Sequence, residues 1–263
     1  MTTEEKKVKV SQELSKKSGN MFASFDFGSL KVDIQDMFKA GVYFGHQKSR
    51  RNPKMDAYIF GVKNGINIID LEKTAIKVKE AQAFIKKLVA QGEEIILIGT
   101  KKQVKKIIID AAEIAGVPHV AERWLGGTLT NFPVIAKRTK FLRDGQEKME
   151  KGEYSQYTKF EQMKIREELE KLEEKMGGIK TIQKLPGAIF VTGVNEDNLA
   201  IKEAQKKNIP IIALTDTNVN PEGIDYIIPA NEDAVSSLKL MLAYIIQAIL
   251  EGKKQIEEKQ ITS

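Results

Sequence analysis

The chain has 263 residues, of which 41% are hydrophobic and 30% are charged, and its formal net charge is +6. This composition is typical of a soluble globular protein that is long enough to build a proper core. It contains no cysteine, which excludes disulfides, Cys-ligated zinc and thiol catalysis. Residues 1–18 lack the apolar segment of a secretory signal, and the apolar run 238–250 is too short to span a bilayer. We therefore expect a cytoplasmic protein with no membrane partner.

The charge is distributed unevenly along the chain. From Asn195 onward the sequence carries seven Lys/Arg and eleven Asp/Glu, whereas the preceding part carries 35 against 25. This asymmetry favours docking of one face on a polyanion over binding all round. A nucleic acid is the expected partner, because each Lys or Arg can neutralise one phosphate.

The first 31 residues are polar and mixed in charge, and they show no helical or strand periodicity before Phe22. We therefore expect a flexible N-terminal extension over 1–31. Its aromatic residues Phe22, Phe25 and Phe27 could dock on a neighbouring molecule or contribute nothing. Beyond the extension, apolar spacing predicts helices over 32–40, 71–90, 102–115, 198–207 and 234–250, and strands over 58–60, 66–69, 95–98, 117–120, 188–192, 209–214 and 227–228.

This alternation predicts an α/β fold with a doubly wound parallel sheet. The apolar run Ile95–Ile98 lies between Gly92 and Gly99, as in parallel strands that are buried on both faces. Helices of this length between strands indicate right-handed crossovers, which place the strands side by side in one sheet. We expect residues 32–131 and 185–250 to form the core, and 251–263 to form a polar C-terminal tail.

Two further helices interrupt the alternation between residues 132 and 184. In each of them apolar residues recur three and four apart, and a short polar loop around 151–156 separates them. This period is typical of an antiparallel coiled-coil hairpin, although Thr139 and Gln146 at seam positions would weaken it. The alternative is a pair of ordinary surface helices packed on the sheet. We favour a short, fairly mobile arm whose second helix is capped by Gly177 and Gly178.

Three basic clusters are candidates for contact with a nucleic acid, and on double-stranded RNA they would act through phosphates and shape more than through base edges. The first is a loop with no acidic residue from Gly41 to Met55. The second follows strand 95–98 at a predicted helix start, where free N–H groups favour an anion. The third flanks Trp124, the sole tryptophan, which is more often a core residue than a platform for a base. The residues predicted to bind the nucleic acid are Lys48, Arg50, Arg51, Lys54, Lys63, Lys101, Lys102, Arg123, Thr128 and Asn131.

Other kinds of chemistry have weaker support in the sequence. The segment 99–102 could be the phosphate loop of a nucleotide-binding enzyme, but no complete phosphate-loop, dinucleotide or nucleophile-elbow motif is present. His46 could bind phosphate or lie in the core, and His119 suits the core, because neither has metal-ligand spacing. We therefore expect no catalysis and no cofactor. We also expect no metal, because acidic residues near strand ends would usually only shape turns, as for Asp216, Glu222, Asp225 and Asp233.

Several long segments of the chain resemble the ribosomal protein uS2 family. They are, in order, Gly41–Asp70, Arg123–Phe132, Leu185–Ala204, Lys207–Asn218 and Ile227–Lys239. The resemblance implies a flavodoxin-like domain with a coiled-coil arm. It also implies binding to small-subunit ribosomal RNA, a structural part in translation, and help in recruiting the large OB-repeat protein of the same subunit. The N-terminal extension departs from the family, and we expect it to order only on the ribosome or against a neighbouring protein.

Overall fold

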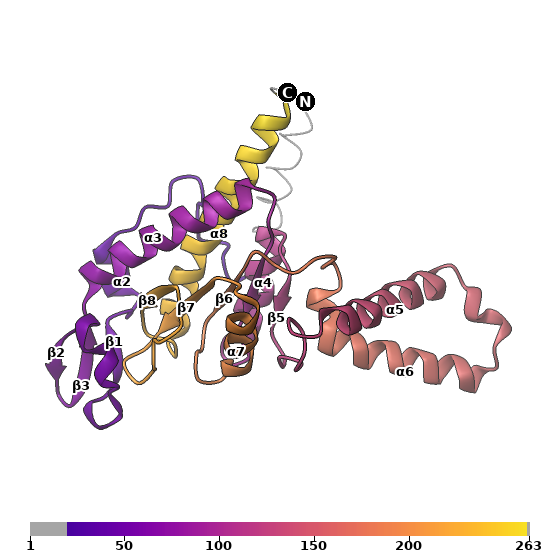
Figure 1. The fold of residues 1–263 in the computed structure, drawn as a ribbon, viewed down its shortest axis with the longest axis horizontal. Helices are drawn as coiled ribbons and strands as arrows, with labels where there is room; N and C mark the ends of the chain where they lie inside the picture. Colours follow the sequence, from indigo (N-terminus) through magenta and orange to yellow (C-terminus); the bar gives the residue numbers. More distant parts are fainter. Residues whose placement is uncertain (1–19, 262–263) are drawn as a thin grey trace.

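The computed structural model describes residues 20–261, and residues 1–19 and 262–263 lie outside the described part. Three parts are visible in Figure 1: a central sheet covered by helices, a small sheet at one end, and a two-helix arm that projects from the other end. The central sheet holds the core, because three of its strands are buried along their whole length.

The central sheet has five strands. They are β4 (Ile95–Ile98), β5 (His119–Val120), β6 (Ala188–Val191), β7 (Ile211–Thr215) and β8 (Tyr226–Pro229). All neighbouring strands are parallel, and their order is β5-β4-β6-β7-β8. This is the strand order of flavodoxin-like folds, in which the chain changes direction between its first and third strands. The predicted fold class is therefore confirmed.

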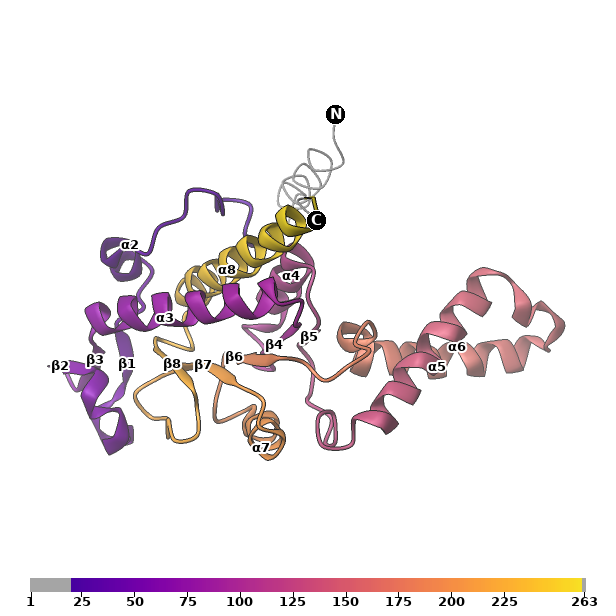
Figure 2. The same ribbon diagram turned by 45° about the horizontal axis from the view of Figure 1, so that its top comes forward.

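Helices cover both faces of this sheet (Figure 2). Ile95 and Leu97 belong to the core cluster on one face, whereas Ile96 and Ile98 belong to the cluster on the other. This alternation follows from the period of two along a strand. The first face carries α3 (Leu71–Ala90), α4 (Lys105–Ala115) and α8 (Val235–Ile261), and the second carries α7 (Asn198–Lys207).

The helix α8 is longer than expected, and the residues predicted as a polar tail continue it as far as Ile261. Gly252 is buried against α3, where an added Cβ would lie 2.9 Å from the carbonyl oxygen of Lys86. This close packing supports the helix beyond the predicted end. Over Val235–Glu258, α8 is long and apolar enough to cross a membrane, but 67% of the apolar window is buried inside the protein, as in a core helix.

The strands predicted over 58–60 and 66–69 do not join the central sheet. They are β2 (Ile59–Lys63) and β3 (Ile66–Ile69), and with β1 (Phe44–Gln47) they form a separate antiparallel sheet in the order β1-β3-β2. Asn64 and Gly65 between β2 and β3 have φ angles of 51° and 77°. Positive φ at both residues is typical of a tight hairpin turn, which joins antiparallel strands.

The arm consists of α5 (Phe132–Glu150) and α6 (Lys159–Met176), which run side by side away from the core in both ribbon views. Two residues expected to weaken its seam are hydrogen-bonded: the Thr139 hydroxyl donates to the Ala136 carbonyl (3.1 Å), and Gln146 Nε2 donates to Glu173 Oε2 (2.8 Å). The arm is anchored at its base, where Ile135 and Met176 join the core cluster. Its mobility stays a prediction.

The part of the N-terminal extension that the structure describes packs on the core. Phe22 is fully buried among residues of α3, α4 and α8, with Phe25 and Phe27 beside it. Met21 N–H donates to Asp110 Oδ2 (2.8 Å), and Gln247 Nε2 donates to the Leu30 carbonyl (2.9 Å). The prediction of a mobile extension therefore fails for residues 20–31, because the three aromatic side chains supply the apolar area that an ordered segment needs. Residues 1–19 of the predicted extension lie outside the described part.

Candidate nucleic-acid interface

The basic loop between β1 and β2 is held against the central sheet. It contains two short 3-10 helices, Lys48–Arg50 and Pro53–Tyr58. The backbone N–H of Asn52 donates to the carbonyl of Thr217 (2.8 Å), in the segment that follows β7. Gly45 lies so close to Thr217 that an added Cβ would be 2.5 Å from the Thr217 methyl carbon. The backbone of the loop is therefore fixed at the carboxyl edge of the sheet, and this fixes the positions from which its basic side chains extend.

Most cations of this loop face solvent. Lys48 and Arg50 in the loop, and Lys63 at the end of β2, are exposed and form no ion pair within the described residues. These three side chains are therefore accessible to phosphates, and their contact with phosphate stays a prediction. Two further cations have exposed carboxylate partners, which contribute little to stability and can be exchanged for phosphate. These pairs are Arg51 with Asp56, and Lys54 with Glu222.

The second cluster is divided by burial. Lys101 Nζ lies 2.9 Å from Glu232, 3.0 Å from Asp233 and 3.6 Å from Glu196. Burial alone would lower the pKa of Lys101, but these carboxylates outweigh it and raise the pKa above its usual value. The expectation that Lys101 contacts phosphate is therefore not supported, because its charge is already neutralised inside the protein. The neighbouring Lys102 is exposed, so its contact with phosphate stays a prediction.

The third cluster is a loop between β5 and the arm, and it is split in the same way. Trp124 is buried, and its indole N–H donates to the carboxylate of Glu203 on α7. Thr128 is also buried and donates its hydroxyl to a carbonyl of its own loop, so the structure does not support the expectation that Thr128 contacts RNA. Arg123 and Asn131 are exposed at the two ends of the loop. The role of Glu203 could not be predicted from the sequence, because nothing in the residues next to a single glutamate in a helix indicates which distant groups bind to it.

All three clusters lie at the carboxyl edge of the central sheet. The first is hydrogen-bonded to the segment after β7, the second follows β4, and the third follows β5. Because the strands are parallel, their carboxyl ends meet at one edge, where ligands of doubly wound folds bind. The clusters do not merge into one patch, since the small sheet and the arm lie at opposite ends of the molecule (Figure 1).

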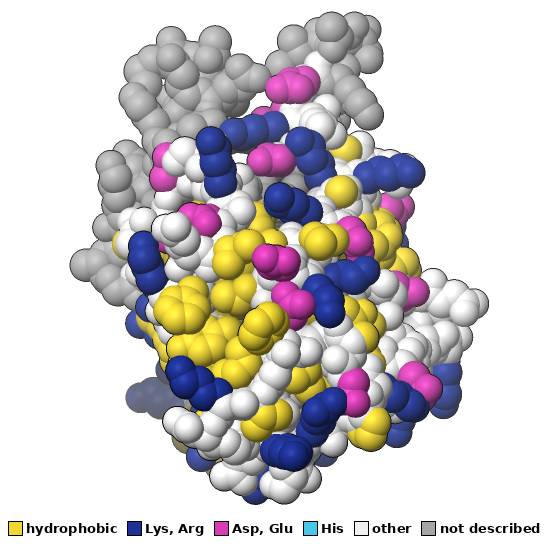
Figure 3. Space-filling view, turned by 90° about the vertical axis from the view of Figure 1, so that its left-hand side faces the viewer, with side chains coloured by type: hydrophobic (Ala, Val, Ile, Leu, Met, Phe, Trp, Pro, Cys, Tyr) yellow, Lys and Arg dark blue, Asp and Glu magenta, His cyan; other side chains and the backbone are white. Residues whose placement is uncertain are grey.

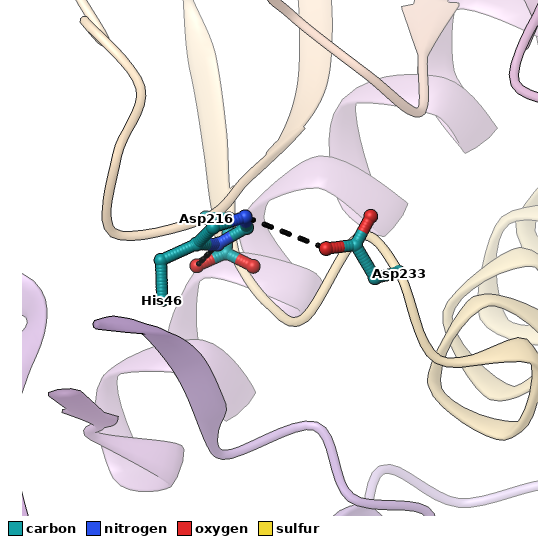
Figure 4. Close-up of side chains that lie close together, drawn as sticks. All are labelled: His46, Asp216 and Asp233. Atoms are coloured by element: carbon teal, nitrogen blue, oxygen red, sulfur yellow. Dashed lines mark ion pairs between the residues drawn. The ribbon is translucent and has the colours of Figure 1, made fainter. Parts of the chain in front are cut away.

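A histidine and two carboxylates gather at the same edge (Figure 4). His46 Nδ1 lies 3.1 Å from Asp216 Oδ1, and His46 Nε2 lies 3.4 Å from Asp233 Oδ2. The hydrogen bond to Asp216 is the main cause that raises the pKa of His46, which favours the protonated ring. One ligand atom from each residue lies within 4.8 Å of the others, so this trio could also hold a divalent cation. Of the four acidic residues near strand ends, only Asp216 and Asp233 belong to this trio, since Glu222 pairs with Lys54 and Asp225 accepts from Ile211 N–H.

A patch of exposed aromatic side chains covers the face formed by α2 (Ile34–Lys39) and the small sheet. Figure 3 shows hydrophobic side chains gathered on this face, with Lys and Arg around them. Phe60 is 80% exposed and Phe38 is 58% exposed. The rings of Phe38 and Tyr43 stack with their centroids 4.6 Å apart, and Tyr43 lies against Phe44. An apolar patch of this kind on a soluble protein is typical of a protein-binding surface.

Comparisons with known proteins identify what this chain is similar to. A sequence model of the family described as ribosomal protein S2 matches residues 37–252. The small ribosomal subunit protein uS2 of Roseiflexus sp. (strain RS-1) is 45% identical over 229 residues, which are 87% of this chain and 87% of that protein. The protein of the same name from Chloroflexus aggregans is 43% identical and covers 87% of this chain, with 96% of its own length matched.

Proposed function

The chain belongs to the ribosomal protein S2 family and is a structural constituent of the small ribosomal subunit, and from this premise we propose that it binds ribosomal RNA along the carboxyl edge of its central sheet. Its place in the cell is therefore the ribosome, in the cytoplasm. The observation that carries the proposal is that Lys48 and Arg50 are exposed on a loop that is hydrogen-bonded to the segment after β7, with the exposed Lys63 at the end of the adjoining strand β2.

The chemistry of this edge suits the RNA backbone. Structured RNA offers phosphates along an A-form helix whose deep groove excludes side chains, so firmly placed cations are an effective way to hold it. The exposed members of the predicted set, together with the half-buried Arg51, provide such contacts: Lys48, Arg50, Arg51, Lys54, Lys63, Lys102, Arg123 and Asn131. A phosphate placed directly beside Glu232 or Asp233 would be repelled, so Lys101, which pairs with both, is left out of this set.

A nucleotide-binding enzyme is the alternative that the sequence raised, and the edge gives it little support. The lysine that would meet the phosphates, Lys101, lies 2.9 Å from Glu232 and 3.0 Å from Asp233. A nucleotide phosphate at this place would have to displace both carboxylates from Lys101. We therefore propose a role without catalysis.

The proposal includes contact with neighbouring small-subunit proteins, among them the large OB-repeat protein that the family resemblance implies. The aromatic patch over α2 and the small sheet supports such contact, since Phe60 and Phe38 expose large apolar areas to water. Removing this area from water on docking is favourable by about 25 cal/mol per Å².

The RNA contact is tested with the triple variant Arg50→Ala/Arg51→Ala/Lys54→Ala. Affinity for small-subunit RNA is measured with the full chain over a range of salt concentrations. The variant should bind more weakly, and the slope of log K against log salt should become shallower by about one for each lost phosphate contact. A matched control removes three exposed lysines from α3 and α8, which cover one face of the sheet: Lys79→Ala/Lys87→Ala/Lys254→Ala. A triple variant with the slope of the wild type would exclude this loop as a phosphate contact.

A further inference from the structure

The side chain of Glu203 gathers five hydrogen bonds from one loop. Its Oε1 accepts from Gly127 N–H (2.7 Å) and from the Trp124 indole (3.3 Å). Its Oε2 accepts from Leu129 N–H (3.0 Å) and from both the N–H and the hydroxyl of Thr130 (3.1 Å each). Burial alone would raise the pKa of Glu203, but these donors outweigh it and lower the pKa. The carboxylate is therefore ionised and held as a fixed internal anion.

The loop around this carboxylate has the form of an anion-binding nest. Backbone N–H groups of three residues donate to the two oxygens of one carboxylate, with Gly127 in the left-handed region at a φ of 92°. Such nests in other proteins hold phosphates or similar anions. Here the anion comes from α7 of the same chain, so the shape of the loop depends on a charge that a distant segment supplies.

The same loop carries both a candidate RNA contact and the root of the arm. Arg123 precedes the nest and is exposed without an ion pair within the described residues. Asn131 follows it, donates its N–H to the Gly127 carbonyl (2.8 Å) and is the N-cap of α5. Apolar contacts of Ile135 and Met176 with the core also hold the base of the arm. Loss of the carboxylate would therefore loosen the loop and tilt the arm without detaching it.

We propose that Glu203 is a positioning residue for the RNA interface, which sets the placement of Arg123 and the direction of the arm without touching RNA. It is buried at the centre of the loop, 5% exposed, and acts only through the groups that it binds. This inference rests on the proposed RNA binding for its Arg123 part, whereas its arm part stands independently of it.

The variant that tests the proposal is Glu203→Gln. Glutamine has nearly the same shape, but one end of its amide is a donor. Whichever way the amide turns, at least two N–H groups of the loop lose their acceptor, and such losses are costly when buried. The matched control is Glu113→Gln, which removes the same charge from an exposed position on α4.

The direction of the arm is measured by pulsed electron resonance between two spin labels. Because the chain has no cysteine, Lys148→Cys on α5 and Lys87→Cys on α3 give two unique labelling sites. We expect a shifted or broadened distance distribution in Glu203→Gln and an unchanged one in Glu113→Gln. Identical distributions in all three proteins would overturn the arm part of the proposal.

The placement of Arg123 is measured by a double-mutant cycle on RNA affinity. Glu203→Gln should weaken binding by about tenfold, within the range for residues that act through others. Arg123→Ala should then have a smaller effect in the Glu203→Gln background than in the wild type, since the cation is already misplaced. Equal effects in both backgrounds would refute positioning of Arg123. No effect of Arg123→Ala in the wild type would instead refute the RNA contact itself, while the label distances would still test the arm.

If Glu203→Gln does not fold, Thr130→Val replaces it in both experiments. This variant removes only the hydroxyl donor (3.1 Å) and keeps the carboxylate with its backbone donors. We expect changes in the same direction and of smaller size. Label distances and RNA affinity equal to those of the wild type would then count against the proposal.

Discussion

Replacing Phe22 with alanine tests whether the N-terminal segment is part of the folded core. Phe22 is fully buried and joins the cluster of α3, α4 and α8. Truncation of a buried Phe to Ala destabilises a protein by about 3–5 kcal/mol, through lost apolar burial and the cavity that remains. The segment also makes the hydrogen bonds of Met21 and Leu30, so its release would add to the loss. We expect Phe22→Ala to lower the free energy of unfolding by at least about 3 kcal/mol.

The assay is urea unfolding of the full chain, followed by circular dichroism. Phe60→Ala is the matched control, because the same atoms are removed from a side chain that is 80% exposed, and its effect should stay within about 0.5 kcal/mol. Equal midpoints for the two variants would refute the packing of Phe22. Hydrogen exchange of the Met21 amide in the wild type at the rate of an unprotected amide would also refute this packing, because the amide donates a hydrogen bond to Asp110.

Two other predictions concern the buried residue Asp197 and the aromatic patch. Burial raises the pKa of Asp197 from its ordinary value of 3.8 to about 6, against the hydrogen bond from Thr100 that lowers it. The folded state thus loses stability as the pH rises from about 4 to 6, where the buried carboxyl group becomes ionised. Asparagine has no such charge, and one pKa unit corresponds to about 1.4 kcal/mol. Asp197→Asn should therefore be more stable than the wild type by up to about 3 kcal/mol at pH 8 and by little at pH 4. Urea unfolding at both values checks this, and a variant that is less stable at pH 8 would contradict it. Phe60→Ala should lower the amount of a neighbouring protein, first of all the large OB-repeat protein, in assembled small subunits without changing the salt slope of RNA binding. Mass spectrometry of those subunits checks the prediction, and an unchanged protein composition would contradict it.

The central fold could be predicted because strands buried on both faces leave a clear record in the sequence. The runs around Ile95–Ile98 and Ala188–Val191 are continuously apolar, and the helices between them show one apolar stripe. The small sheet was harder to predict. Its strands are short and partly exposed, and the Asn64-Gly65 hairpin signal lies inside a segment that also fits a βαβ alternation.

The candidate site could be predicted only as a set of exposed cations. Sequence shows that Lys101 and Lys102 are adjacent, but not that three carboxylates from distant segments surround the first and leave the second exposed. The nest around Glu203 is hidden for the same reason, since Glu203 is more than seventy residues away from its donors along the chain. Burial of Phe22 was missed because a polar segment with three aromatic residues has no periodicity to reveal what it packs against.

The length of the arm turns a small change at its root into a large one at its tip. The helix α5 has 19 residues, and at 1.5 Å per residue it spans about 28 Å. A tilt of about 10° at the Glu203 loop would therefore displace the far end by about 5 Å, which is more than the length of a hydrogen bond. The arm would then act as a lever, with a base that is held by the Glu203 loop and by the apolar contacts of Ile135 and Met176. Whatever binds near the tip is thereby sensitive to the geometry of a loop that it does not touch.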